Sequence, residues 1–142
     1  MSDHPTVTLA TGAVIFKDRE VLLIQRGRPP FMGHWSIPGG KVDFGETIET
    51  ALTREIREET GVEVEILGLI DAFEALPQKN GERHFVMIDY ACRYVSGEVQ
   101  AGDDAMDAGF FALPEAMARL AWDKTRLAIQ QALPYINGSK GK

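Results

Sequence analysis

The stretch from Gly40 to Val62, GKVDFGETIETALTREIREETGV, predicts a loop, a helix and a helix stop. A glycine pair at its start lets the backbone take positive φ angles. Thr47 is placed to cap a helix that continues to Thr60, because a hydroxyl side chain satisfies free amides at a helix start. Gly61 then stands where a helix end favours a left-handed residue. We therefore expect the chain to be organised around one central helix.

This helix has an apolar face that becomes acidic toward its C-terminal end. At about 100° per residue, the apolar stripe consists of Ile48, Ala51, Leu52 and Ile56. Glu55 and Glu59 continue that line, and Glu58 lies on its flank. Three close carboxylates repel one another, and partial burial and the helix macrodipole add to the cost. A hard divalent cation would resolve the repulsion, since Mg²⁺ prefers oxygen ligands, and Arg54 could hold the carboxylates in place.

An acidic helix end can also be a solvated surface, here paired with Arg54 and Arg57, as charge runs usually are. The spacing argues against that interpretation. The stretch reads Gly-x5-Glu-x7-Arg-Glu-aliphatic-x-Glu-Glu-x-Gly-aliphatic, which resembles the Nudix box of a hydrolase family at every specified position. Its seven fixed residues would coincide by chance at a given start roughly once in 10⁸.

The resemblance implies an α/β protein, a Nudix-type α/β/α sandwich with a mixed sheet. It also implies an enzyme that hydrolyses a pyrophosphate bond with the help of Mg²⁺ or Mn²⁺. The implied metal ligands are the Gly39 carbonyl and the carboxylates of Glu55, Glu58 and Glu59. Glu58 and Glu59 are also candidate catalytic residues. Glu46 and Arg54 are expected to support the site, with Glu46 paired to a nearby arginine.

Composition predicts one soluble globular domain, residues 1–142. The chain is long enough for a hydrophobic core, and its 44% hydrophobic and 25% charged residues are ordinary. A net charge of −6 and a pI near 5.0 argue against nucleic acid as a partner. The single cysteine, Cys92, and the lack of a long apolar span indicate a cytoplasmic protein away from membranes. Disorder is expected in the first few residues and in the tail Asn137–Lys142.

Strands and helices are expected to alternate, as in a mixed sheet covered on both faces. The expected strands are Thr6–Lys17, Val21–Gln25, Val62–Ala75, His84–Val95 and Gly109–Leu113, the first two forming a hairpin. Two helices are expected after the last strand, Pro114–Arg119 and Lys124–Leu133. The main loops are Gly27–His34, Leu76–Arg83 and Ser96–Asp104.

The family often supplies a further carboxylate from a downstream loop, as a metal ligand or a general base. The candidates are Glu98, Asp103 and Asp104, with Glu82 weaker. Asp104 is favoured as a catalytic residue, because its spacing before Phe110 resembles that of members acting on nucleoside triphosphates. The alternative is a turn in which these aspartates only bond to their own backbone.

Four further residues are candidates for substrate binding: Arg26, Arg28, Trp35 and Arg83. Arginine suits phosphate because its planar donors match the oxygens, although Arg26 and Arg28 could be ordinary surface charges. Trp35, like Phe31, could stack on a base or ribose, or Trp35 could fill the core. Arg83 and His84 resemble a pair found in members that act on nucleoside triphosphates.

The expected substrate is a small nucleotide, a nucleoside diphosphate linked to another moiety. Pro77 stands near a proline of members that act on ADP-ribose, and this favours ADP-ribose or a similar nucleotide sugar. The compact length and Glu82-Arg83-His84 point instead to a sanitising nucleoside triphosphate pyrophosphohydrolase. A third possibility is a sensor domain that binds nucleotide without cleaving it, although such a domain is expected to lose a box glutamate. A homodimer is possible.

Overall fold

The computed structural model describes residues 5–29 and 31–137. The strands are β1 (Val7–Lys17), β2 (Glu20–Arg26), β3 (Trp35–Ser36), β4 (Gly39–Lys41), β5 (Glu63–Ala75), β6 (His84–Ser96) and β7 (Ala105–Ala112). The helices are α1 (Ile48–Thr60), α2 (Leu113–Arg119) and α3 (Asp123–Ile136). Disorder was predicted for the first few residues and for the tail Asn137–Lys142. Residues 1–4 and 138–142 lie outside the described residues. None of the described helices is long and apolar enough to cross a bilayer.

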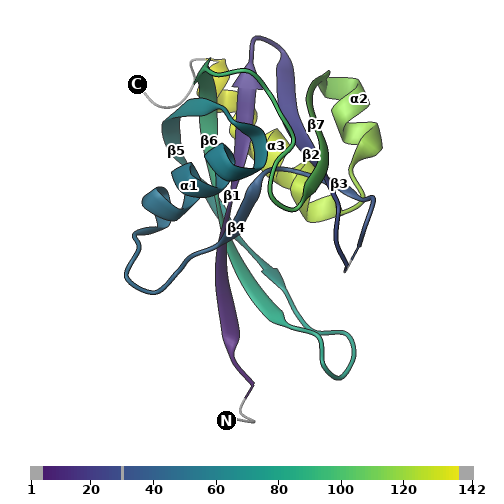
Figure 1. Cartoon of the computed structure of the whole chain (residues 1–142). Helices are drawn as coiled ribbons and strands as arrows, with labels where there is room; N and C mark the ends of the chain where they lie inside the picture. The colour runs from purple at the N-terminus through teal and green to yellow at the C-terminus, as the bar shows by residue number, and fades with distance from the viewer. Residues whose placement is uncertain (1–4, 30, 138–142) are drawn as a thin grey trace.

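The strands form one mixed sheet with β1 near its centre (Figure 1). Along Val7–Phe16, β1 pairs in parallel with β6, and its other edge pairs antiparallel with β4 and then with β2. The order β3-β2-β1-β6-β5 is completed by β7, which pairs with β2. The predicted hairpin of the first two strands and the mixed sheet are therefore confirmed.

Helices cover both faces of the sheet, because β1 is apolar on both sides. Val14 and Phe16 pack into a cluster that includes side chains of α2 and α3. Ala13 and Ile15 point the other way and pack against Leu52 and other side chains, including those of α1. This alternation follows from the period of two residues in a strand. The result is the predicted α/β/α sandwich (Figure 1).

The ends of α1 are formed by the residues that the sequence singles out. The Thr47 side chain accepts a hydrogen bond from the Thr50 amide, as expected of an N-cap. Gly61 adopts φ 76°, and its amide donates to the Arg57 carbonyl. The loop and helix therefore position the acidic residues of α1 beside β4.

Two expectations about the C-terminal part need correction. β7 begins at Ala105, well before the predicted Gly109, because the strand pairs with β2 from Ala105 to Ala112, with a register shift that leaves Met106 without a partner on β2. Leu113, predicted as the end of that strand, is instead the first residue of α2. α3 also extends beyond its predicted end and continues through Pro134 to Ile136. Pro134 has no amide, so this turn lacks the hydrogen bond that another residue there would donate to the carbonyl four positions earlier.

Candidate active site

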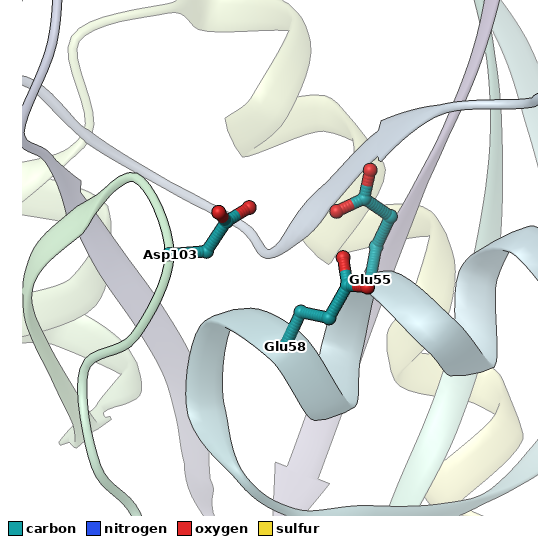
Figure 2. A group of neighbouring side chains, drawn as sticks. All are labelled: Glu55, Glu58 and Asp103. Atoms are coloured by element: carbon teal, nitrogen blue, oxygen red, sulfur yellow. The ribbon is translucent and has the colours of Figure 1, made fainter.

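Three carboxylates from two segments lie together at one end of α1. Glu55 and Glu58 come from the helix, and Asp103 comes from the loop before β7. One carboxylate oxygen of each lies within 4.8 Å of the others. Figure 2 shows the Asp103 carboxylate turned toward the two glutamates. We call these three residues the acidic group.

Glu59 lies behind this group and is nearly buried, with 7% of its surface exposed. Its Oε1 accepts a hydrogen bond from the Gly39 amide at 2.9 Å. Burial raises the pKa of Glu59 to about 8, and the nearby charges of Glu55, Asp103 and Asp104 act in the same direction. The Gly39 amide opposes this shift, because a hydrogen bond to the carboxylate favours its charged form.

Glu55 is also perturbed, and for a similar reason. Burial raises its pKa, and the negative charges of Glu58 and Asp103 add to the effect, while Arg54 opposes it. Carboxylates are thus collected at a site where their charge is poorly solvated. An oxygen-only set of this kind matches the preference of Mg²⁺ and Mn²⁺ for hard ligands. The residues present therefore fit a divalent cation.

Arg54 links the acidic group to the loop before α1. Its Nε and Nη2 donate to the two carboxylate oxygens of Glu46, at 2.8 and 2.9 Å. Its Nη1 donates to Glu58 Oε1 at 3.2 Å. The hydrogen bond from Arg54, together with one from the Asp43 amide, lowers the pKa of Glu46 to about 2. Glu46 thus holds the arginine that contacts the glutamates.

The glycine pair allows β4 to approach both β1 and α1. A Cβ on Gly39 would lie 2.1 Å from the Thr11 carbonyl oxygen. A Cβ on Gly40 would lie 2.1 Å from Oε2 of Glu55. The absence of a side chain, more than a special φ angle, is therefore what these two positions require.

The favoured downstream carboxylate, Asp104, lies next to the acidic group without joining it. Its Oδ1 pairs with the Arg28 Nε at 2.9 Å, and Asp103 takes the place beside the glutamates. Adjacent residues in a tight turn direct their side chains differently, so sequence spacing alone did not distinguish the two aspartates. Arg28 is thereby brought to the edge of the site.

The other predicted substrate-binding residues are more scattered. Arg26 ends β2 opposite Ala105, close to the loop that carries Asp103. The Trp35 ring packs edge-on against Phe111, and the Arg119 guanidinium lies over it. Trp35 therefore packs against the hydrophobic core, which was the alternative to substrate stacking.

Arg83 lies apart from the acidic group. It lines an open groove with Val7 and His84, where the β5–β6 hairpin projects away from the helices (Figure 1). Val7 stands about 13 Å along β1 from Thr11, the residue that pairs with Gly40.

A buried carboxylate that the sequence analysis did not single out is Asp89 of β6. It is 6% exposed, and burial raises its pKa to about 7, against the effect of a hydrogen bond from the Gly12 backbone. A Cβ on Gly12 would lie 2.7 Å from Asp89 Oδ1, so the Asp89 carboxylate leaves no room for a side chain at position 12. The signal in the sequence is one acidic residue within the otherwise apolar run of the strand.

The motif, the fold and the acidic group agree with a comparison against protein families. The model described as the NUDIX domain matches residues 6–131. This chain belongs to the NUDIX hydrolase family. The predicted family and enzyme class are confirmed, and the members are pyrophosphatases that act on phosphoanhydrides.

Proteins similar to this NUDIX hydrolase include enzymes named for acting on ADP-ribose and on 8-oxo-dGTP. It is 38% identical over 135 residues to an ADP-ribose pyrophosphatase of Methanocaldococcus jannaschii, covering 95% of this chain and 77% of that protein. It is 39% identical over 72 residues to an 8-oxo-dGTP diphosphatase of Proteus vulgaris, covering 50% and 64%. A MutT NUDIX hydrolase from Burkholderia pseudomallei has a similar structure, with a TM-score of 0.76, 35% identity, and coverage of 89% of this chain and 98% of that one.

Proposed function

We propose that this NUDIX hydrolase cleaves the pyrophosphate bond of a nucleoside diphosphate linked to another moiety, in a reaction that depends on Mg²⁺ or Mn²⁺. The acidic group beside the buried Glu59 is the observation that carries the proposal. We also infer one domain over residues 1–142 that works in the cytoplasm; the homodimer stays a prediction. A single sheet with strands from β1 to β7, and a buried unpaired Cys92, support the inference.

Each side chain of the site has a proposed task. Glu55, Glu58 and Asp103 would hold the cation, together with Glu59 and the Gly39 carbonyl. A divalent ion bound there would neutralise phosphate charge and make a water molecule more acidic. Glu58, Glu59 and Asp104 are the candidates to accept the proton of that water. Among the residues beyond these carboxylates, Glu46 and Arg54 would keep the glutamates in position.

The proposed phosphate contacts are the arginines at the edge of the site. Arg28 and Arg26 lie on the side of the acidic group where the loop after β2 meets the loop before β7. A guanidinium there would bind phosphate oxygens in a bidentate manner. Trp35 and Arg83 remain predictions for the far end of an extended substrate.

ADP-ribose is the proposed substrate. Its support is the relative from Methanocaldococcus jannaschii, which aligns with almost the whole of this chain. The second candidate is a nucleoside triphosphate, supported by the shorter alignment with an 8-oxo-dGTP diphosphatase. The third, nucleotide binding without cleavage, has less support because every box glutamate is present.

A panel of purified-protein assays tests this proposal. ADP-ribose, other nucleotide sugars, dinucleoside polyphosphates and nucleoside triphosphates would be compared with Mg²⁺ or with EDTA. We expect ADP-ribose to be cleaved fastest, to AMP, and EDTA to abolish the activity. Formation of a monophosphate and pyrophosphate from triphosphates would favour the second candidate. Tight binding without turnover would favour the third.

Variants connect the activity to the site. Glu58→Gln and Glu59→Gln should each lower turnover at least about 100-fold, because a ligand carboxylate matters more than the outer partners of a metal site. Glu65→Gln is the matched control, since Glu65 is an exposed glutamate of β5 that pairs with Arg93 and is not part of the acidic group. Full Mg²⁺-dependent activity in both site variants would refute the proposal.

A further inference from the structure

Asp103 and Asp104 form a two-residue turn, and their side chains point to different parts of the fold. The turn is closed by a hydrogen bond from the Ala105 amide to the Gly102 carbonyl at 3.0 Å, and Asp103 has φ 54°. Asp103 reaches the glutamates of α1, while Asp104 pairs with Arg28. The position of one aspartate therefore constrains the other.

The segment before this turn is fixed to the end of α1. The Gln100 amide donates to the Thr60 carbonyl at 2.9 Å, and the Gly102 amide donates to the Glu59 carbonyl at 3.0 Å. Both carbonyls belong to the last turn of a helix, where they have no partner within the helix. A Cβ on Gly102 would lie 2.5 Å from the Glu58 carbonyl oxygen, so the contact is close.

The turn itself is fixed from the opposite side, by the loop after β2. The Gly27 amide donates to the Asp104 carbonyl at 2.7 Å, and the Arg28 Nε lies 2.9 Å from Asp104 Oδ1. One backbone contact and one ion pair thus hold Asp104. The ion pair is the part that depends on side chains.

Asp103 needs such support because its surroundings repel it. Its carboxylate faces Glu55 and Glu58, and its charge raises the pKa of Glu55. In the part of the chain that the structure describes, no lysine, arginine or histidine forms an ion pair with Asp103. Arg28, from the loop after β2, is a cation that binds the neighbouring residue of the turn, Asp104.

We propose that the Arg28–Asp104 ion pair is a positioning device, which holds the turn so that Asp103 points into the acidic group and completes a divalent-cation site. This inference rests on the proposed function, because it assumes that the acidic group binds the cation. Arg28 and Asp104 act here through Asp103, as positioning residues. Any contact of Arg28 with a phosphate would be a separate role.

The sign of one mutational effect distinguishes positioning from simple electrostatics. Replacing Arg28 by methionine removes a positive charge near the site, and by Coulomb's law alone this should strengthen cation binding. Loss of positioning should weaken it, because Asp103 would move away from the glutamates. The two explanations therefore predict opposite changes in affinity for the same variant.

Direct Mn²⁺ binding, measured by electron paramagnetic resonance or calorimetry without nucleotide, makes the test independent of turnover and of phosphate contacts. The proteins are the wild type, Arg28→Met, Asp104→Asn and the double variant. Arg93→Met is the matched control, since it removes an exposed arginine–glutamate pair of the sheet. Thermal unfolding would confirm that each variant is folded, as expected for side chains that are 71% and 46% exposed.

We expect Arg28→Met to weaken Mn²⁺ binding roughly two- to fivefold, the range found for exposed ion pairs. Asp104→Asn should weaken it as well, and its effect should shrink once Arg28 is absent, because a shared interaction is lost only once. Arg93→Met should leave the affinity unchanged.

Unchanged or tighter Mn²⁺ binding by Arg28→Met would overturn the inference, as would fully additive effects in the double variant. Either result would leave the proposed function intact if the wild type binds Mn²⁺ and Glu55→Gln abolishes that binding. A wild type that binds no Mn²⁺ would overturn the metal site of the proposed function and the inference together.

Discussion

At the scale of single residues, the carboxylates of this protein differ because their surroundings differ. Glu46 is held by a bidentate arginine, and its pKa is lowered to about 2. Glu59, thirteen residues later and nearly buried, has its pKa raised to about 8. The same functional group is thus an anchor at one position and a candidate ligand or base at another. The pairing of Glu46 with Arg54 and the desolvation of Glu59 account for the opposite pKa shifts.

Asp89 permits a prediction about pH. Its pKa is about 7 in the folded protein and 3.8 as an isolated group, so its favourable contribution to stability is complete below about pH 3.8 and is lost as the pH rises through 7. In Asp89→Asn, the side chain at position 89 does not titrate, so this pH-dependent loss of stability is absent. Between pH 4 and pH 8, the free energy of unfolding of the variant should therefore rise relative to the wild type, by about 4 kcal/mol at most.

Urea denaturation at several pH values would measure this difference. Asp71→Asn serves as the control, because Asp71 is an exposed aspartate that lies opposite Asp89 in the register of β5 and β6. A difference between Asp89→Asn and wild type that does not change with pH would contradict the assigned burial effect.

At the scale of elements, the bounds of α1 are set by local sequence signals, and its C-terminal end carries the glutamates of the site. Thr47 and Gly61 form its caps, and its last carbonyls bind the loop that carries Asp103. A helix C-terminus normally disfavours anions. The carboxylates there are retained against that cost, and this agrees with a functional role for the helix end.

The N-cap of α1 should contribute measurably to stability. Thr47→Ala removes the hydrogen bond that the Thr50 amide donates, and we expect a loss of about 1 kcal/mol in the free energy of unfolding. Thr53→Ala is a control from the same helix, because the Thr53 hydroxyl donates to the Glu49 carbonyl within the helix. That change should stay within about 0.5 kcal/mol. Equal losses in chemical denaturation would show that the cap contributes no more than a hydroxyl inside the helix, against this prediction.

At the scale of the whole molecule, the site is assembled where three parts of the chain meet. β4 supplies Gly39 and Gly40, α1 supplies the glutamates, and the loop before β7 supplies Asp103. The central strand β1 makes this possible, since it pairs with β4 while its buried side chains carry helices on both faces. Folding thus gathers negative charge at one point.

A divalent cation should therefore stabilise the folded protein as a whole. Mg²⁺ at a hundred times its Kd should add about 2.7 kcal/mol to the free energy of unfolding, because the unfolded chain lacks the site. We expect Tm to rise by several degrees with Mg²⁺ and to fall again with EDTA. Glu55→Gln should abolish most of the rise, and Glu65→Gln should keep it. An identical Tm for the wild type with and without Mg²⁺ would count against a preformed site.

The central helix, its caps and the acidic residues on it could be predicted from the sequence alone. They depend on side-chain period, capping chemistry and motif spacing, all of which are encoded within a short stretch. The mixed sheet followed from the order of strands and helices along the chain and from the family resemblance. The glycine pair and the pairing of Glu46 with an arginine belong to the same local information, and the structure brings Glu46 and Arg54 together.

Three features could be established only from the folded protein: which aspartate faces the glutamates, how far β7 extends, and the burial of Asp89. Each depends on partners far away in sequence: Arg28 for Asp104, β2 for β7, and Gly12 for Asp89. The same holds for Trp35, whose ring packs on Phe111. Spacing along the chain carries no record of such contacts, because they form only when the sheet brings distant segments side by side.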